Sequence, residues 1–539
     1  MMNLSFFGRK LQRLCSPYFH FDFNSFFIQL CYFMILSLFG YLGLKVSKTR
    51  THVRPNNFDL FYTSVSASTV SSMTAVEMEV FSNSQLVLMT LLMFVGGEVF
   101  TSLLDLLFER FNNNPYTCST KDNQSVKISS NSLPIKQEVN SQIVELGLVS
   151  IPNHHSSSQD HKQIDINNST NNNDVPNGTI VVSYNNSNKD ILRSNSLRYL
   201  SHVVFGYLLV LQFVGSFLVS MYMTFIPSAR QVLREKGIKT LTFSMFTIVS
   251  TFASCGYVPT NENMIVFKKN SGLLLIILPY VLLGNTLYAP CLRFVIWVLK
   301  KITKREEFSY LLKNSKEIGY GHLLPSLHSW LLVGTVLGLN LLQLVLFCSM
   351  EWGTQIMDGL NPYQKFVASL FQITNARHAG ESVFDLSTIS SAILVLFVVM
   401  MYLPPYTTFM PIMDHETEND AKKEKRKSLV ECLVLSQLSY LVIFIILICI
   451  TENKSLREDP LNFNVLNITI EVISAYGNVG FSTGYSCARQ LKPNGSCKDL
   501  WVGFSGKWSN KGKFILILVM FFGRLKKFNM KGGKAWDLS

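Results

Sequence analysis

The stretch Ser64-Val65-Ser66-Ala67-Ser68-Thr69-Val70-Ser71-Ser72 contains a pattern that returns three more times along the chain. The pattern is Val or Ile, then Ser or Thr, then five residues of any kind, and then Gly or Ser. Its four copies run from Val65-Ser66 to Ser72, from Val249-Ser250 to Gly256, from Ile373-Thr374 to Gly380, and from Ile473-Ser474 to Gly480. Since the offset is the same in all four, we interpret the chain as a fourfold internal repeat.

Each copy lies between two apolar runs, and each run is about long enough to cross a bilayer core of roughly 30 Å as a helix. The eight runs are 26–44, 86–108, 203–226, 272–299, 330–348, 390–413, 429–450 and 513–530. The segments between paired runs, at 61–73, 241–255, 363–376 and 463–476, are too short and too polar to cross. Backbone of that kind survives at membrane depth only when it is buried in protein or lines water. We therefore predict an all-α membrane protein with eight transmembrane helices in four helix–pore loop–helix repeats, pseudo-fourfold around one pore.

The composition supports a membrane protein. Of the 539 residues 48% are hydrophobic and only 15% are charged, against about a quarter charged in soluble proteins. The net charge of +13 comes from residues in the connectors, where it suits lipid headgroups and not nucleic acid. The ten cysteines show no metal-ligand spacing, so we expect no resident metal and no cofactor.

These runs divide the chain into domains. Pore repeats are expected at 24–108, 197–299, 324–413 and 429–539, the last with the C-terminal tail. Residues 1–23 form the predicted N-terminal tail, and 109–196, rich in Asn and Ser, a predicted disordered loop. The linkers 300–323 and 414–428 are strongly basic, which places them, the loop and both termini in the cytoplasm.

The last position of the pattern indicates an ion filter built from Ser72, Gly256, Gly380 and Gly480. A filter replaces the hydration shell of a cation with backbone carbonyls, and glycine reaches the dihedrals that this requires. A short helix ending just before that point directs its negative end at the cation. The alternative is an ordinary glycine turn at the end of a buried helix. Four copies at one offset favour the filter.

These motifs resemble the pore loops of plant HKT transporters, which are related to microbial Trk and Ktr potassium transporters. The resemblance is carried by Ser64-Val65-Ser66-Ala67 to Glu79, by Thr251-Phe252-Ala253-Ser254-Cys255-Gly256 with Pro259-Thr260-Asn261-Glu262-Asn263, and by Ile473-Ser474-Ala475-Tyr476-Gly477-Asn478-Val479-Gly480-Phe481. It extends from about residue 20 to the end, except for the loop at 111–196.

In that family, serine at the first filter position and glycine at the other three accompany sodium selectivity. The resemblance therefore implies passive, channel-like sodium transport across the plasma membrane, homodimers, and a role in retrieving sodium from plant vascular sap. The alternative is a potassium transporter or a sodium–potassium symporter on the same scaffold. Ion-replacement currents separate these two hypotheses.

The positions of several other residues in the sequence suggest roles for them. Arg524 lies in the last run, where the resemblance implies a constriction below the filter; the alternative is that its side chain snorkels to the interface. Glu77, Glu79, Glu262 and Glu381 follow filter positions, and they either form an acidic outer vestibule or serve as caps and ion-pair partners. Breaks are expected at Gly284-Asn285 with Pro290 and, from the resemblance, at Leu403-Pro404-Pro405.

Two further hypotheses concern the outer face and catalysis. Cys487 and Cys497 lie in the outer loop after the fourth filter, where a disulfide is expected, with glycosylation sequons at Asn453 and Asn494. An enzyme would have to use His378 and Glu381 as a metal or acid–base pair. That pair is a weak signal and does not explain a fourfold repeat, so we predict that the chain is not an enzyme. It also lacks a phosphate-binding G-x-x-x-x-G-K-[ST] motif for direct ATP coupling.

Overall fold

The computed structural model describes residues 25–51, 54–112, 178–408, 437–491, 497–501 and 503–529. Within these ranges the chain is helical, and the β-structure is limited to one isolated bridge between Tyr485 and Leu500. The predicted N-terminal tail, most of the 109–196 loop, the basic linker 414–428 and the sequon at Asn494 lie outside the described residues.

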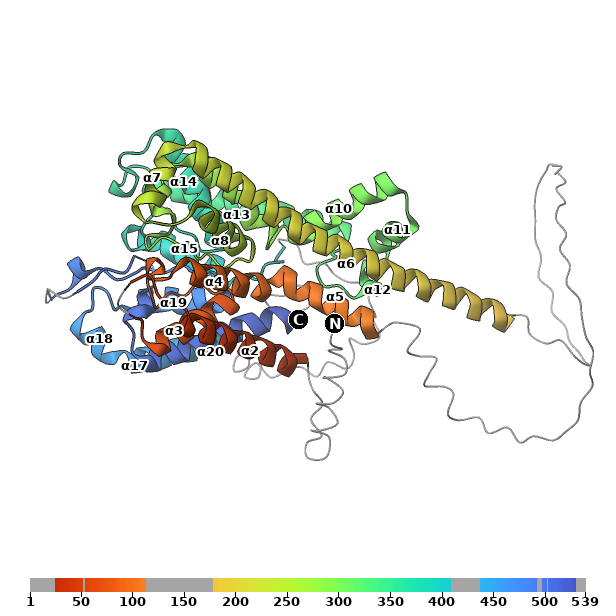
Figure 1. Ribbon diagram of the computed structural model, residues 1–539, viewed down its shortest axis with the longest axis horizontal. Helices are drawn as coiled ribbons and strands as arrows, with labels where there is room; N and C mark the ends of the chain where they lie inside the picture. Colours follow the sequence, from red (N-terminus) through yellow and green to blue (C-terminus); the bar gives the residue numbers. More distant parts are fainter. Residues whose placement is uncertain are drawn as a thin grey trace, which may run out of the picture.

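The helices follow the predicted order of span, short helix, span (Figure 1). The first group consists of α2 (Ser25–Val46), α3 (Asn57–Ser68), α4 (Asn83–Gly96) and α5 (Glu98–Asn112). The second group consists of α6 (Gly178–Phe225), α7 (Pro227–Glu235), α8 (Thr240–Phe252), α9 (Ser271–Leu283) and α10 (Tyr288–Thr303). A linker contains α11 (Glu306–Lys313) and α12 (Ser315–Ile318). The last two groups are α13 (Ser326–Glu351), α14 (Pro362–Asn375) and α15 (Ser391–Tyr402), then α17 (Gln437–Thr451), α18 (Asn453–Glu458), α19 (Val465–Gly477) and α20 (Asn510–Asn529).

The four short helices α3, α8, α14 and α19 lie in the predicted re-entrant segments and form the centre of the protein. Their C-terminal halves are buried, including polar residues such as Ser66, Ser250 and Ser474. The long helices around them leave large apolar side chains uncovered on the outside, for example Phe213, which is 68% exposed, and Trp330, which is 76% exposed. An apolar exterior around a partly polar interior is the arrangement expected in a bilayer.

Three helices of the described chain are long and apolar enough to cross a membrane, at Phe27–Val46, Lys189–Phe225 and Ser326–Glu351. Counting each of two bent helix pairs as one span raises that number to five. The described part of α17 has 15 residues, and α15 has only 12. The predicted count of eight spans, with pseudo-fourfold symmetry, therefore stays a prediction.

The second run of each of the first three repeats is interrupted. The predicted continuous helix at 86–108 is instead two helices, α4 and α5, which meet at 53° because Gly97 is extended, with ψ of 149°. The predicted break at Gly284-Asn285 is confirmed: α9 and α10 meet there at 85°. In the third repeat α15 ends at Tyr402, directly before Leu403-Pro404-Pro405, because proline disfavours helix in the preceding residue.

The predicted disordered loop is wrong at its two ends. Helix α5 continues to Asn112, and α6 begins at Gly178, so that α6 projects beyond the rest of the bundle in Figure 1. Extending an existing helix costs little compared with starting one, which lets a polar sequence continue a membrane helix. Ion pairs support this extension, with Lys189 Nζ 3.2 Å from Glu317 Oε1 and Arg193 Nη2 3.6 Å from Glu109 Oε1.

Candidate cation pathway

The four aligned positions share one unusual backbone conformation. The φ angles of Ser72, Gly256, Gly380 and Gly480 are 52°, 91°, 68° and 105°. This left-handed region costs a residue with a Cβ about 1–2 kcal/mol, so the three glycines relieve strain that Ser72 must bear. The common conformation supports the alignment that the sequence pattern proposed.

The four positions also lie against one another. A Cβ added to Gly256 would overlap the carbonyl oxygen of Ala379, and one added to Gly380 would overlap that of Val479. A Cβ on Gly480 would meet the Cβ and Oγ of Ser72, and the carbonyl oxygen of Cys255 at 3.1 Å. Segments more than 400 residues apart in the chain are therefore brought together, and Ser72 contributes the side chain that faces Gly480.

Hydrogen bonds from the pore helices hold these loops in place. The amide of Ser71 donates to the carbonyl of Ser66 at 2.8 Å, and Cys255 donates in the same way to Ser250 at 2.8 Å. In the fourth repeat Val479 donates to Ser474 at 3.0 Å, and the Ser474 hydroxyl accepts from the Gly480 amide at 3.0 Å. The second residue of the motif thus anchors the loop with its backbone carbonyl in these three repeats. In the first and fourth repeats its hydroxyl does so as well, since the Ser66 hydroxyl accepts from the Met73 amide at 2.7 Å.

The third repeat follows a shifted version of this arrangement. Here the Gly380 amide donates to Asn375 at 3.1 Å, one residue beyond the motif threonine. The Asn375 side-chain oxygen also accepts from the Glu381 amide at 3.3 Å. The same loop is therefore held by a different residue, which a search for sequence identity between repeats does not find.

A second set of glycines, which sequence reasoning missed, fixes the helices that follow the filter loops. A Cβ on Gly96 would overlap the carbonyl oxygen of Ser68, one on Gly284 that of Phe252, and one on Gly523 that of Tyr476. Each of these carbonyls lies four residues before the filter position of its own repeat. Alignment of the second apolar runs, in addition to the pore loops, could have found this close approach.

Arg524 follows the last of these glycines and is buried, with 1% of its surface exposed. Its Nη2 donates to the carbonyl oxygen of Gly96 at 2.5 Å, and its guanidinium lies 5.5 Å from the centre of the Phe33 ring. The break at Gly97 interrupts the helical hydrogen bonding beside that carbonyl. This inward position differs from the snorkelling alternative, in which the side chain would reach the membrane surface.

Arg377 is a second buried arginine, which was not among the residues expected to have a function. It stands three residues before Gly380 and is 6% exposed. Its Nη2 donates to the carbonyl oxygen of Pro404 at 2.7 Å, so it connects the third filter loop to the break after α15. A cationic residue inside a re-entrant segment was the signal that could have found it, because charges at membrane depth are costly and functional by default.

The residues of the enzyme hypothesis have other roles. His378 is buried, with Nδ1 2.6 Å from the carbonyl oxygen of Thr374 and Nε2 2.9 Å from the Thr286 hydroxyl. The Glu381 carboxylate accepts a hydrogen bond from the Thr251 hydroxyl of α8. No group of three potential metal ligands occurs in the described ranges. These contacts assign the pair to packing between repeats.

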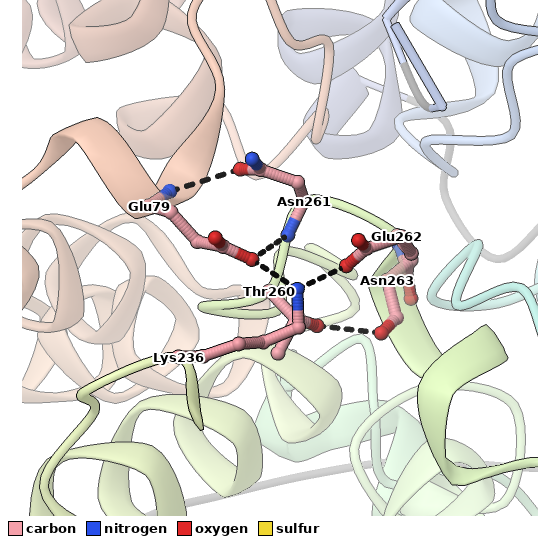
Figure 2. Close-up of polar contacts among 6 residues, drawn as sticks. All are labelled: Glu79, Lys236, Thr260, Asn261, Glu262 and Asn263. Atoms are coloured by element: carbon pink, nitrogen blue, oxygen red, sulfur yellow. Dashed lines mark hydrogen bonds and ion pairs between the residues drawn. The ribbon is translucent and has the colours of Figure 1, made fainter. Parts of the chain in front are cut away.

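The structure corrects the predicted acidic vestibule at Glu381, which is fully buried between the third filter loop and α8. Glu79 and Glu262 both pair with Lys236 (Figure 2). Burial raises the pKa of Glu77, and Glu79 raises it further. An acidic outer vestibule at Glu77, Glu79 and Glu262 stays a prediction, and two of these three carboxylates are paired with Lys236.

The loop after the fourth filter contains the expected disulfide between Cys487 and Cys497, whose Cα atoms are 5.9 Å apart. The amide of Cys487 donates to the Asp499 carboxylate at 2.6 Å. The bond closes an outer loop that leads back toward Phe504 and Ser505. The amide of Ser505 donates to the buried carboxylate of Glu471 on α19 at 3.0 Å.

Comparison with known proteins identifies the family. Residues 178–530 match the TrkH family, described as "Cation transport protein". The chain is 47% identical to "Cation transporter HKT1;3" of Oryza sativa subsp. japonica, over 96% of this chain and 92% of that protein. It is 48% identical to "Sodium transporter HKT1" of Arabidopsis thaliana, over 92% of each chain.

More distant proteins share the scaffold. "Potassium transporter TRK1" of Candida albicans is 26% identical over 61% of this chain and 32% of its own length. The crystal structure of the potassium transporter TrkH from Vibrio parahaemolyticus has the same fold, with a TM-score of 0.51, at 13% identity, over 95% of this chain and 85% of that one. This chain is a membrane protein, and it belongs to the TrkH family of cation transport proteins together with the plant HKT transporters.

Proposed function

We propose that the chain conducts sodium passively through a pore whose filter contains Ser72, Gly256, Gly380 and Gly480. The observation that carries this proposal is the mutual contact of four left-handed backbone positions from four separate segments. The choice of ion is supported by a relative with 48% identity, which is named a sodium transporter.

The mechanism follows from the ends of the pore helices. Helices α3, α8, α14 and α19 each end a few residues before their filter position, which directs four negative helix ends toward the same place. A cation that sheds water there is compensated by backbone carbonyls and by these dipoles. The gradient of sodium drives the flux, and no cofactor and no enzymatic step is required.

Ser72 distinguishes one quarter of the filter from the rest. It supplies a Cβ and a hydroxyl that face Gly480, where the other three positions have hydrogen. This asymmetry supports sodium preference over a symmetric glycine ring. A potassium transporter or a sodium–potassium symporter remains the alternative, since relatives of this family include named potassium transporters.

Arg524 is proposed as the constriction below the filter. Its guanidinium donates to the Gly96 carbonyl inside the protein. Arg524 also directly follows Gly523, the glycine that packs against the fourth pore helix, α19. We further propose that the protein lies in the plasma membrane with both termini in the cytoplasm, and that it forms homodimers. Family membership and the basic linkers support these assignments.

The deciding experiment is two-electrode voltage-clamp recording of the full chain in oocytes. We expect the reversal potential to follow external sodium and to respond only weakly to external potassium. Equal shifts for the two ions would overturn sodium selectivity and favour the alternative. Water-injected oocytes and surface labelling control for endogenous currents and for expression.

A further inference from the structure

Lys236 joins the outer loops of the first two repeats. It caps the C-terminal end of α7, and its Nζ lies 2.5 Å from Glu79 Oε1 and 2.5 Å from Glu262 Oε2 (Figure 2). The lysine side chain is 16% exposed, and the two glutamate side chains are 26% and 25% exposed. The ammonium therefore occupies the point on which both carboxylates converge.

The turn at Asn261 holds Glu79 in place beside this point. Asn261 donates its amide to Glu79 Oε1 at 3.1 Å, and its side-chain oxygen accepts from the Glu79 amide at 3.0 Å. The same turn continues into Asn263, whose side-chain oxygen accepts from the amide of Ser382 at 3.3 Å. Asn263 also lies against the filter, with Nδ2 3.5 Å from the Gly256 carbonyl oxygen. The cluster is thus built into the rim of the proposed filter.

Charged groups of both signs lie close together at this rim. A third carboxylate, Glu77, interacts electrostatically with Glu79 and Glu262 and also with the lysines Lys498 and Lys507. Burial alone would lower the pKa of Lys236, but its hydrogen bonds to Glu262 and Glu79 outweigh this and leave that pKa raised. The ion pairs therefore favour the charged form of the lysine. The cluster of Lys236, Glu79 and Glu262, counted as one ammonium and two carboxylates, has a net charge of −1.

We propose that Lys236 is a tethered counter-ion that sets the cation affinity of the outer mouth and keeps divalent cations out of it. Two converging carboxylates are ligands that Ca²⁺ readily accepts, and the lysine ammonium takes the place such an ion would fill. Sodium then reaches the filter without competition from a bound divalent cation. Lys236 acts indirectly, through the carboxylates of Glu79 and Glu262, and is therefore a positioning residue. The inference rests on the proposed cation pathway.

The test uses a series of full-length variants that differ in cluster charge. Lys236→Gln leaves two unpaired carboxylates, with a charge of −2, whereas Lys236→Arg and the double variant Lys236→Gln/Glu262→Gln keep −1. Sodium currents are recorded at matched surface abundance while external CaCl₂ is raised. For Lys236→Gln we expect inhibition at Ca²⁺ concentrations on the order of tenfold lower than for the parent, because an extra charge in a low-dielectric mouth concentrates divalent ions strongly. The two charge-matched variants should stay close to the parent.

Three results would overturn the proposal. The first is an unchanged Ca²⁺ sensitivity of Lys236→Gln at normal abundance, and the second is a double variant as sensitive as the single one. If Lys236→Gln does not reach the surface, Glu262→Gln decides, because its cluster charge is 0. The half-saturating sodium concentration should then rise about twofold or more, and an unchanged value is the third contrary result. A parent chain without any sodium current would instead refute the proposed function.

Discussion

Replacing Ser72 by glycine tests the filter most directly. Ser72 has a φ of 52°, and its Cβ and Oγ are the atoms that a side chain on Gly480 would meet. Glycine removes these atoms and relieves a left-handed strain of about 1–2 kcal/mol. We take the relieved strain energy as the change in the difference between the sodium and potassium barriers. A change of about 1.4 kcal/mol in that difference corresponds to a tenfold change in relative permeability.

The expected result is therefore a potassium-to-sodium permeability ratio that rises about tenfold in Ser72→Gly. The assay is the reversal potential in oocytes on replacing external sodium with potassium. Ser72→Ala is the matched control, because it keeps the Cβ and loses only the hydroxyl, and so separates steric from hydrogen-bonding effects. An unchanged ratio in a Ser72→Gly variant with normal surface abundance would refute the assignment of selectivity to this residue.

Three other predictions concern flux, packing and pH. Arg524→Gln keeps a hydrogen-bond donor for the Gly96 carbonyl but removes the positive charge. The sodium current should therefore rise and its voltage dependence should weaken, while the permeability ratio stays constant. A current equal to that of the parent at equal surface abundance would place Arg524 outside the pathway. Gly256→Ala should abolish the current or the delivery to the surface, because the added Cβ would overlap the backbone of Ala379 and the φ of this position is 91°. Gly206→Ala is the control, since a Cβ there meets no neighbouring atom. Normal currents from Gly256→Ala would contradict the close packing of the proposed filter. The pKa of Glu77 is raised above 4.5, so this carboxylate takes up its proton before an ordinary glutamate as external pH falls toward that value, and sodium current should decline over the same range. Titrating Glu77→Gln checks this, since a decline of the same size in that variant would assign the effect to another group.

Much of the fold can be predicted from local sequence. Apolar runs and short polar segments mark where helices form, and the constant offset in the motif identified four backbone positions that prove to share a left-handed φ. The break at Gly284-Asn285 was also predictable, because glycine and asparagine tolerate departures from helix. These features depend on neighbouring residues along the chain, so a linear sequence contains them.

Features that depend on distant segments were predicted less well. The extended conformation of Gly97, which divides α4 from α5, accompanies close packing of Gly96 on Ser68 and the hydrogen bond from Arg524. Gly96-Gly97 was visible in the sequence, but nothing nearby shows that an arginine more than 400 residues later donates to that carbonyl. The charge of Arg377 was visible in the sequence too, but its partner Pro404 on another element was not.

The fourfold repeat, the four aligned positions and the pairing candidates Cys487 and Cys497 can all be read from the sequence. The environment of each carboxylate depends on the tertiary structure. Glu262 and Glu381 both closely follow a glycine of the proposed filter, yet one pairs with Lys236 at a partly exposed site and the other is buried against Thr251. The physical reason is that the electrostatic and solvation energies of a charge depend on the groups that surround it in space, and these come from segments far apart in the chain.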